Sequence, residues 1–419
     1  MSESAEIKKD PISQFNLAEK YYSGNGVEKN IAEAIKFYLL SAKDGYAPTQ
    51  NALGNIYYHG IDIIADYKEA YGLYKLAAEQ GHIEAQFNLG YLYEYGEGVE
   101  QDFKQAHDWY KKSAEQGNAK AQYALAVLYE EGNGVTKDVQ GAFGWAMKAA
   151  EQGYSKAQNL LGCYYYSGEG IESDKEQAFK WHLSAATAGN ETAMYNLGTM
   201  YHTGDFLKTD YKKAHHWFKL SADQGNGDSQ KMLGELYYCG QGVEENLEES
   251  FRWFKLSANQ DNLDGLLGLA FMYRYGQGTG KDIAEAFKCY KKSKKLGSEQ
   301  ADEEIKNMLI EEFKLLPFII DNLIAVGVEE AKIPDKDPER KTNLEAEIKK
   351  LNERQVALES SNTEKDGKIK EQVEQIRLLT KTISDEDEKN KKAKEMLYGK
   401  ATTMKSEWSD DEDEYLKQK

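Results

Sequence analysis

The chain has 419 residues, of which 53 are lysine or arginine and 71 are aspartate or glutamate, giving a formal charge of −18. This acidity disfavours binding to the phosphate backbone of nucleic acids. Three cysteines are too few for a disulfide scaffold, so we expect an intracellular, most simply cytoplasmic, location. The first residues show no apolar leader, and no apolar run is long enough to span a bilayer, so we expect no membrane association.

Residues 1–10 form an N-terminal tail, after which a period of 36 residues divides residues 11–298 into eight units without a gap. Position 7 of every unit is leucine, position 11 is tyrosine and position 14 is glycine. Position 8 is always glycine or alanine, which would let a neighbouring helix approach closely.

Each unit predicts two helices, which we name helix A and helix B. In the unit 83–118, Ala85, Leu89, Gly90 and Tyr93 share one face of helix A, and Gly96 ends that helix. The predicted core face of helix A has positions 3, 4, 7, 8 and 11. Position 20, Asp102 in this unit, is Asp or Asn in all eight and predicts the N-cap of helix B. Because one hairpin cannot bury its apolar face alone, we expect the units to stack into an all-α solenoid.

The run from Ala85 to Val99, followed by Asp102 to Gly117, resembles the Sel-one-like repeat, a relative of the tetratricopeptide repeat with a longer inter-helix loop. The resemblance covers residues 11–298. It implies a right-handed α-solenoid of eight helical hairpins that serves as an adaptor scaffold in multi-protein complexes. The departures from the pattern are Asp62 and Phe206 for the second loop glycine, Ser250 for the helix B alanine, Cys289 for the tryptophan and Lys294 for the late alanine.

Residues 299–330 are predicted to cap the last unit, and residues 331–338 form a polar linker that contains proline. A heptad pattern in residues 339–384 predicts coiled-coil-like helices through which the chain self-associates, with solvated helices or a fold-back hairpin as the alternative. The capping segment begins with a predicted helix over residues 299–316, whose inward side chains would be Ile305, Met308, Leu309, Phe313 and Leu316.

Residues 385–419 carry blocks of like charge, which are typical of disordered tails. Trp408 in an acidic run suits a docking peptide, and Ser384 and Ser409 precede acidic runs as sites of acidophilic kinases do. Lys391 to Lys394 is a weak match to a nuclear-import signal. For each of these features the alternative is a tail that only solvates the protein.

The sequence shows no pattern of catalytic or metal-binding residues. The seven histidines fit no metal-ligand spacing with one another or with a cysteine. The loop glycines, such as Gly96 and Gly98, lack the preceding strand and the Lys-Ser/Thr pair of a phosphate loop, which indicates ordinary turns. We therefore predict a protein that is not an enzyme and holds no cofactor or metal.

The face of helix A opposite its apolar face, at positions 5, 9, 12 and 13, differs from unit to unit. In a tetratricopeptide-like superhelix this face lines a concave groove, where tyrosines beside polar residues suit peptide binding. The alternative is that these side chains pack between adjacent A helices. The candidate groove residues are Asn51, Tyr58, Phe87, Tyr123, Asn159, Tyr166, Tyr195, His202, Lys231, Tyr238 and Arg274.

These features together predict a non-enzymatic scaffold or adaptor that binds a segment of a protein partner in the groove. One alternative is a regulatory or activator subunit of an enzyme complex, which differs only in the identity of the partner. The other is a protein that binds glycans or cell wall. Bacterial relatives of that kind carry a leader and paired cysteines in each repeat, and this chain shows neither.

Overall fold

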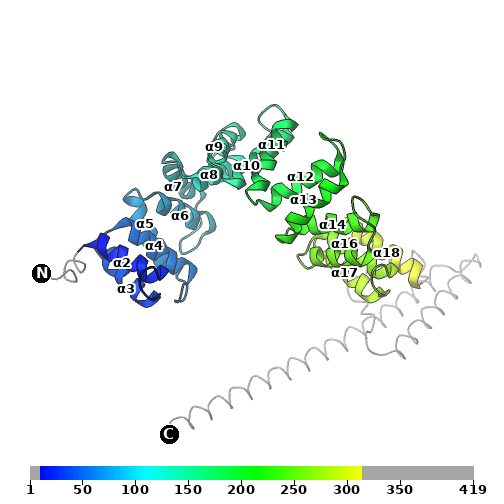
Figure 1. The fold of residues 1–419 in the computed structure, drawn as a ribbon, viewed down its shortest axis with the longest axis horizontal. Coiled ribbons are helices and arrows are strands. Elements are labelled where there is room, and N and C mark those ends of the chain that lie inside the picture. Colours follow the sequence, from blue (N-terminus) through cyan, green and yellow to red (C-terminus); the bar gives the residue numbers. More distant parts are fainter. Residues whose placement is uncertain (1–9, 314–419) are drawn as a thin grey trace, which may run out of the picture. The chain divides into compact units, whose positions relative to one another are not determined.

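A computed structural model describes residues 10–313, and this part of the chain contains helices, turns and loops but no strand (Figure 1). Each 36-residue unit supplies two helices, so the predicted all-α array of eight helical hairpins is confirmed. The A helices are α2 (Pro11–Ser23), α4 (Ala47–His59), α6 (Ile83–Tyr95), α8 (Ala119–Glu131), α10 (Ser155–Ser167), α12 (Glu191–Thr203), α14 (Gly227–Cys239) and α16 (Leu263–Tyr275). The B helices are α3 (Ile31–Lys43), α5 (Tyr67–Glu79), α7 (Phe103–Glu115), α9 (Val139–Glu151), α11 (Lys175–Thr187), α13 (Tyr211–Asp223), α15 (Leu247–Ala258) and α17 (Ile283–Lys295).

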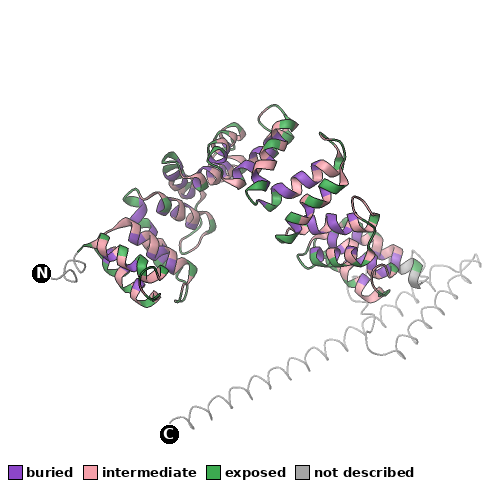
Figure 2. Ribbon diagram, viewed as in Figure 1, coloured by how far each residue is buried: buried purple, intermediate pink, exposed green. Residues whose placement is uncertain are grey.

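The described residues belong to two compact units that meet in sequence at Asn246 and Leu247. In the first, every helix from α2 to α13 packs against the next helix of the chain. In the second, α15, α16, α17 and α18 (Glu299–Phe313) do the same. Figure 2 shows buried residues along the sides of helices that face a neighbour. The predicted linker, coiled coil and charged tail lie outside the described residues.

The predicted helix ends are present in the structure. In the unit 83–118, the φ of Gly96 is 71°, a left-handed conformation that glycine adopts without steric cost. At the start of α7, Asp102 Oδ1 accepts hydrogen bonds from the backbone N–H groups of Lys104 and Gln105, each at 3.0 Å. Such a cap contributes about 1 kcal/mol to stability, and the arrangement recurs along the chain.

In α6 four of the five predicted core positions, 3, 4, 7 and 8, are buried, and position 10 takes the place of position 11. In α6, Ala85, Leu89 and Leu92, at positions 3, 7 and 10, are fully buried. Tyr93, at position 11, is only half-buried, although the pattern predicts it in the core. The reason is that positions 3, 7 and 10 follow the 3.6-residue period on the side that meets helix B. Gly90 at position 8 lies so close to helix B that a Cβ there would be 2.7 Å from Tyr110 Cδ1.

From the third repeat on, the constant tyrosine at position 11 packs against the preceding repeat. Its ring meets the ring at position 25 of that repeat edge-on, and for Tyr93 and Tyr71 the ring centroids are 5.7 Å apart and the hydroxyls 2.9 Å apart. The same pairing joins Tyr129 to His107 in the next repeat. The position 11 tyrosines thus hold successive hairpins together, which explains why the residue recurs although it is not fully buried.

The loop after each A helix also docks on the preceding repeat. A Cβ on Gly98 would lie 2.2 Å from the backbone oxygen of Tyr67, at the start of helix B one repeat earlier. Gly134 and Gly242 meet the corresponding backbone of their preceding repeats. Gly26, in the first repeat, has no atom within 4 Å of such a Cβ, because no repeat precedes it. In the repeats that carry it, the loop glycine is therefore required by the contact with the preceding repeat.

A ladder of glutamine side chains runs through the repeats. Gln86 at position 4 donates to the backbone oxygen of Ala78 and accepts a hydrogen bond of 2.7 Å from Gln116 Nε2 at position 34 of its own repeat. Three repeats make this glutamine pair. In the fifth repeat position 34 is Ala188, and the buried Gln158 Oε1 has no hydrogen-bond partner among the described residues.

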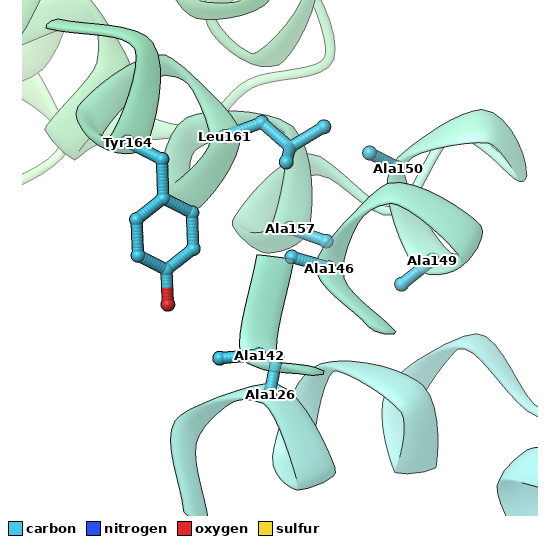
Figure 3. Packing of buried hydrophobic residues seen from close by; sticks show 8 residues of the cluster. All are labelled: Ala126, Ala142, Ala146, Ala149, Ala150, Ala157, Leu161 and Tyr164. Atoms are coloured by element: carbon cyan, nitrogen blue, oxygen red, sulfur yellow. The ribbon is translucent and has the colours of Figure 1, made fainter. Parts of the chain in front are cut away.

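The fourth repeat departs from the pattern at the contact between its two helices. Position 28 is Ala146, where most other repeats have an aromatic ring or histidine. Tyr164, from position 10 of the following repeat, is buried in the same cluster as Ala126, Ala142 and Ala146 (Figure 3). A large residue from one repeat thus fills space that a small residue leaves in its neighbour, as close packing of the interior requires.

Helix α18 continues the register of the A helices beyond the eighth repeat. Ala301, Ile305 and Met308 stand at positions 3, 7 and 10 and are buried, and Ser298 accepts a hydrogen bond from the N–H of Ala301. The predicted capping helix is therefore present and packs on α17. The other residues predicted to face inward are Leu309 and Phe313, whose side chains the structure does not describe, and Leu316, which lies outside the described residues.

Replacing Gly98 with alanine should destabilise the chain by about 3 kcal/mol or more. A left-handed φ costs about 1–2 kcal/mol for a residue with a Cβ, and the overlap with the Tyr67 backbone adds about 1–3 kcal/mol. The matched control is Gly117→Ala in the same repeat, where φ is 95° but no atom lies within 4 Å. Urea unfolding followed by circular dichroism checks this, and equal losses in the two variants would contradict the docking role of Gly98.

Replacing Ala188 with glutamine should stabilise the chain by about 1 kcal/mol, because the new Nε2 can donate to the unsatisfied Gln158 Oε1. The backbone is already suitable, since φ is −82° at Ala188 and −86° at Gln116. Ala188→Glu has nearly the same shape but no amide donor, and it should give no gain. A melting temperature that rises equally in both variants would show that the hydrogen bond is not the cause.

Candidate partner-binding surface

The eleven predicted groove residues lie at positions 5 and 12 of the A helices, on a surface that we name the A-face: positions 5, 9, 12 and 13. Tyr166 is 39% exposed, and nine others are partly buried. Arg274 is the exception, because it is 1% exposed. Consecutive A helices touch here, since Asn88 Nδ2 of α6 donates to Asn51 Oδ1 of α4 at 3.0 Å. The A-face is thus continuous between these repeats.

The predicted residues at position 5 are engaged with their surroundings. The rings of Phe87 and Tyr195 lie 5.5 and 5.8 Å from the position 28 rings of their own repeats. Tyr123 meets Tyr154 edge-on at 5.5 Å. The predicted alternative of packing between helices therefore describes much of the contact area of these side chains, and only their remaining exposed parts form the A-face.

Asn159 takes part in a polar pair that repeats the one at Asn51. Its Oδ1 accepts from Asn196 Nδ2 at 3.0 Å and lies 3.0 Å from His182 Nδ1. Burial lowers the pKa of His182 to about 4, so this imidazole is neutral at pH 7 and donates to Asn159. The histidine occupies position 28, where it replaces an aromatic ring, and its role is structural.

The residues at position 12 bridge to the next repeat or to helix B. The Tyr166 hydroxyl donates to Asp205 Oδ2 at 2.7 Å, and Lys175 Nζ pairs with the same oxygen at 2.6 Å. His202 meets Tyr211 edge-on at 5.4 Å. Tyr58 lies among aromatic rings and meets those of Tyr67 and Tyr91 edge-on.

At position 5, Lys231 forms an ion pair of 3.1 Å with Glu235.

Arg274 does not belong to an open surface. Its guanidinium pairs with Glu304 at 3.1 Å and Glu311 at 2.7 Å, both on α18. The prediction of Arg274 as a groove residue is therefore corrected: the arginine binds the capping helix to the eighth repeat. The signal in the sequence is the continuation of the 36-residue register into α18, where Glu304 and Glu311 stand at positions 6 and 13.

A group of carboxylates on the A-face was not predicted. Glu94, Glu130 and Glu131 stand at positions 12 and 13 of α6 and α8, and Glu169 follows in the loop after α10. Burial raises the pKa of Glu94 and of Glu130, and the neighbouring carboxylates add to the rise. The signal in the sequence is that position 12 is glutamate in two consecutive repeats, where most of the others have an aromatic residue or histidine.

The described part of the chain gives little support for other kinds of site. Within residues 10–313, no three His, Cys, Asp or Glu side chains gather closely enough to hold a metal ion. None of the helices in that range combines the length and apolar character needed to cross a bilayer. The candidate phosphorylation sites Ser384 and Ser409 and the Lys391–Lys394 match lie outside the described residues.

Replacing Glu130 with glutamine should raise the melting temperature at pH 7. In the folded chain the pKa of Glu130 is above its unfolded value, so charging this group costs stability as the pH rises through that interval, and the cost is complete above the folded pKa. Below the unfolded pKa, about 4.3, the advantage should vanish. The control is the exposed loop residue Glu100, changed to glutamine, which should shift the melting temperature little. An unchanged or lower value for Glu130→Gln at pH 7 would contradict the prediction.

Comparison with known proteins gives the same repeat boundaries as the period, except that the sixth match begins at residue 192 and not at 191. The Sel1 repeat model matches residues 11–46, 47–82, 83–118, 119–154, 155–190, 192–226, 227–262 and 263–298. No curated protein sequence matches the chain.

Two solved structures are similar over most of the chain. A Sel1 repeat protein from Oxalobacter formigenes is 31% identical, with 72% of this chain and 88% of that one covered and a TM-score of 0.57. The protein c5321, a protective antigen of uropathogenic Escherichia coli with an SLR fold, is 28% identical, with 82% and 80% covered and a TM-score of 0.50. Eight matched repeats and these similarities show that the chain belongs to the Sel1 repeat family.

Proposed function

We propose that this chain is a non-enzymatic scaffold that binds an extended segment of a partner protein along the A-face. Sel1 repeats typically mediate protein–protein interactions, and the family is generally non-catalytic. If the partner is an enzyme, the chain acts as its regulatory subunit through the same surface.

The observation that carries the proposal is the contrast between constant and variable positions. Positions 7, 11 and 14 hold one residue type in all eight repeats, and each has a packing or backbone role. Position 12, on the A-face, ranges from tyrosine to glutamate, histidine and arginine. The positions that are constant in every repeat are thus separate from those that differ along the array, which is how a repeat scaffold presents a specific surface.

The tyrosines of the A-face are suited to contact a peptide. Tyr58 and Tyr166 are held by neighbouring side chains, so little further side-chain freedom is lost on binding. A tyrosine supplies apolar area together with a hydroxyl, and such residues dominate the energetics of many interfaces. The partial burial of these side chains therefore supports a preorganised surface.

The test is affinity capture followed by mass spectrometry with the intact chain. A variant with Tyr58, Tyr166 and Tyr238 changed to alanine should lose specific partners, with affinity reduced about tenfold or more for each partner that contacts a tyrosine hot spot. The control changes the exposed helix B residues Leu76 and Leu220 to alanine, away from the A-face. Circular dichroism confirms that both variants fold. The same set of partners on the wild-type chain and the tyrosine variant would refute the proposal.

A further inference from the structure

One arginine of the chain lies in a site built from two successive helices of the A register. The guanidinium carbon of Arg274, at position 12 of the eighth repeat, is 5.1 Å from the ring centroid of Tyr275 at position 13. Its nitrogens pair with Glu304 and Glu311, at positions 6 and 13 of α18. Phe271 at position 9 lies beside Tyr275, with the two ring centroids 4.7 Å apart. The guanidinium is thus held next to an aromatic pair by carboxylates of the following helix.

The third repeat has a matching aromatic pair and a matching carboxylate but no arginine. Tyr91 and Tyr95 occupy positions 9 and 13, and their ring centroids are 4.5 Å apart. Glu131 stands at position 13 of the following A helix, α8, as Glu311 does in α18. Position 12 is Glu94, so the third repeat has a carboxylate where the eighth has the guanidinium. We name Tyr91, Glu94, Tyr95 and Glu131 the Tyr95 site.

The members of the Tyr95 site interact with one another, and the described part of the chain brings no cation to them. Tyr95 interacts with both Glu94 and Glu131. Burial, together with the charge of Glu131, raises the pKa of Glu94. Within residues 10–313 neither carboxylate forms an ion pair with a lysine or arginine. Their other contacts are neutral, since the Tyr110 hydroxyl donates to Glu94 at 2.5 Å and Asn133 Nδ2 donates to Glu131 at 2.6 Å.

Aromatic rings elsewhere in the same repeats are covered by lysines of the chain itself. Lys112 Nζ lies 3.7 Å from the ring centroid of Trp109, and Lys148 Nζ lies 3.9 Å from that of Trp145. Tyr95 is 56% exposed, and no lysine or arginine among residues 10–313 lies over its ring. An aromatic ring bordered by two carboxylates is therefore open to a cation that comes from another molecule.

An arginine side chain matches the Tyr95 site better than a lysine does. The guanidinium group is planar and stacks on aromatic rings, and its five N–H groups reach two carboxylates at once. It can donate to Glu94 and Glu131 while its face lies on Tyr95. Arg274 makes this combination of contacts in the eighth repeat. A lysine ammonium is a more strongly hydrated point charge, which gives up more solvation for the same contacts.

We propose that the Tyr95 site binds an arginine side chain of an extended segment of a partner protein. This inference rests on the proposed use of the A-face for partner binding and names a residue that the partner carries. Positions 9, 12 and 13 form the site, so a segment that follows the A-face passes over it. Tyr95 and Glu131 are exposed, and a site this open holds one side chain but does not enclose a small molecule as a ligand pocket does.

The test is NMR spectroscopy of the intact chain with 13C-labelled tyrosine rings, titrated with the peptide Ser-Gly-Ser-Arg-Ser-Gly-Ser. The signals of Tyr91 and Tyr95, assigned through the variants Tyr91→Phe and Tyr95→Phe, should shift saturably. The same peptide with lysine in place of arginine should bind about threefold or more weakly. The double variant Tyr95→Ala, Glu131→Gln, followed at Tyr91, should bind the arginine peptide about tenfold more weakly. The control Leu76→Ala, Glu115→Gln changes two exposed helix B residues and the net charge equally, and should stay within about twofold.

Three outcomes would overturn the inference. The first is equal affinity for the arginine and lysine peptides, a comparison that uses the unaltered chain and so does not depend on how any variant folds. The second is equal loss of binding in the two double variants, checked for folding by circular dichroism, which would indicate attraction to the overall charge. The third is free L-arginine that binds more tightly than the peptide, which would identify a site for the amino acid. None of these depends on the capture experiment, so the inference can fail while the scaffold function stands.

Discussion

Contact between successive repeats is the constraint on which the rest of the structure depends, because a single helical hairpin leaves one face unburied. Two positions make this contact specific. The loop glycine, as at Gly98, lies against the backbone of the preceding helix B with no room for a Cβ, and the tyrosine at position 11 meets a side chain of the same preceding helix edge-on. Both depend on the preceding repeat, which is why Gly26 in the first repeat has nothing to meet.

Because the contact between successive repeats recurs with the same geometry, it constrains the side of helix A that meets helix B. The residues of the A-face remain free to vary. Substitutions in the core must then be matched between repeats. Ala146 is accompanied by Tyr164 from the next repeat, and Ala188 leaves Gln158 without its partner. Tyr164 thus compensates for the small residue Ala146, whereas nothing in the described residues compensates for Ala188. The array therefore tolerates small defects locally, since each repeat interacts chiefly with its neighbours.

Much of the fold could be predicted from the sequence because its causes are local and periodic. Gly96 ends a helix through its own φ, and Asp102 caps the next helix through N–H groups two and three residues away. The site was harder to predict because its causes lie between repeats. The period assigns Arg274 to the A-face, but only the packing of α18 shows that Glu304 and Glu311 bury it. The exposed fraction of the position 5 aromatics likewise depends on neighbouring rings.

The carboxylates Glu94 and Glu130 of the A-face show that the constant contacts between repeats do not decide every residue. A carboxylate whose pKa is raised by burial and by like charges makes the folded chain less stable at neutral pH than a neutral residue would. Such a cost is expected on a surface proposed to bind a partner, where stability does not decide the residue. The contacts that recur between repeats supply stability that offsets this cost. An array of eight repeats can therefore hold several unbalanced charges on the A-face without losing its fold, provided that the docking glycines and tyrosines are retained.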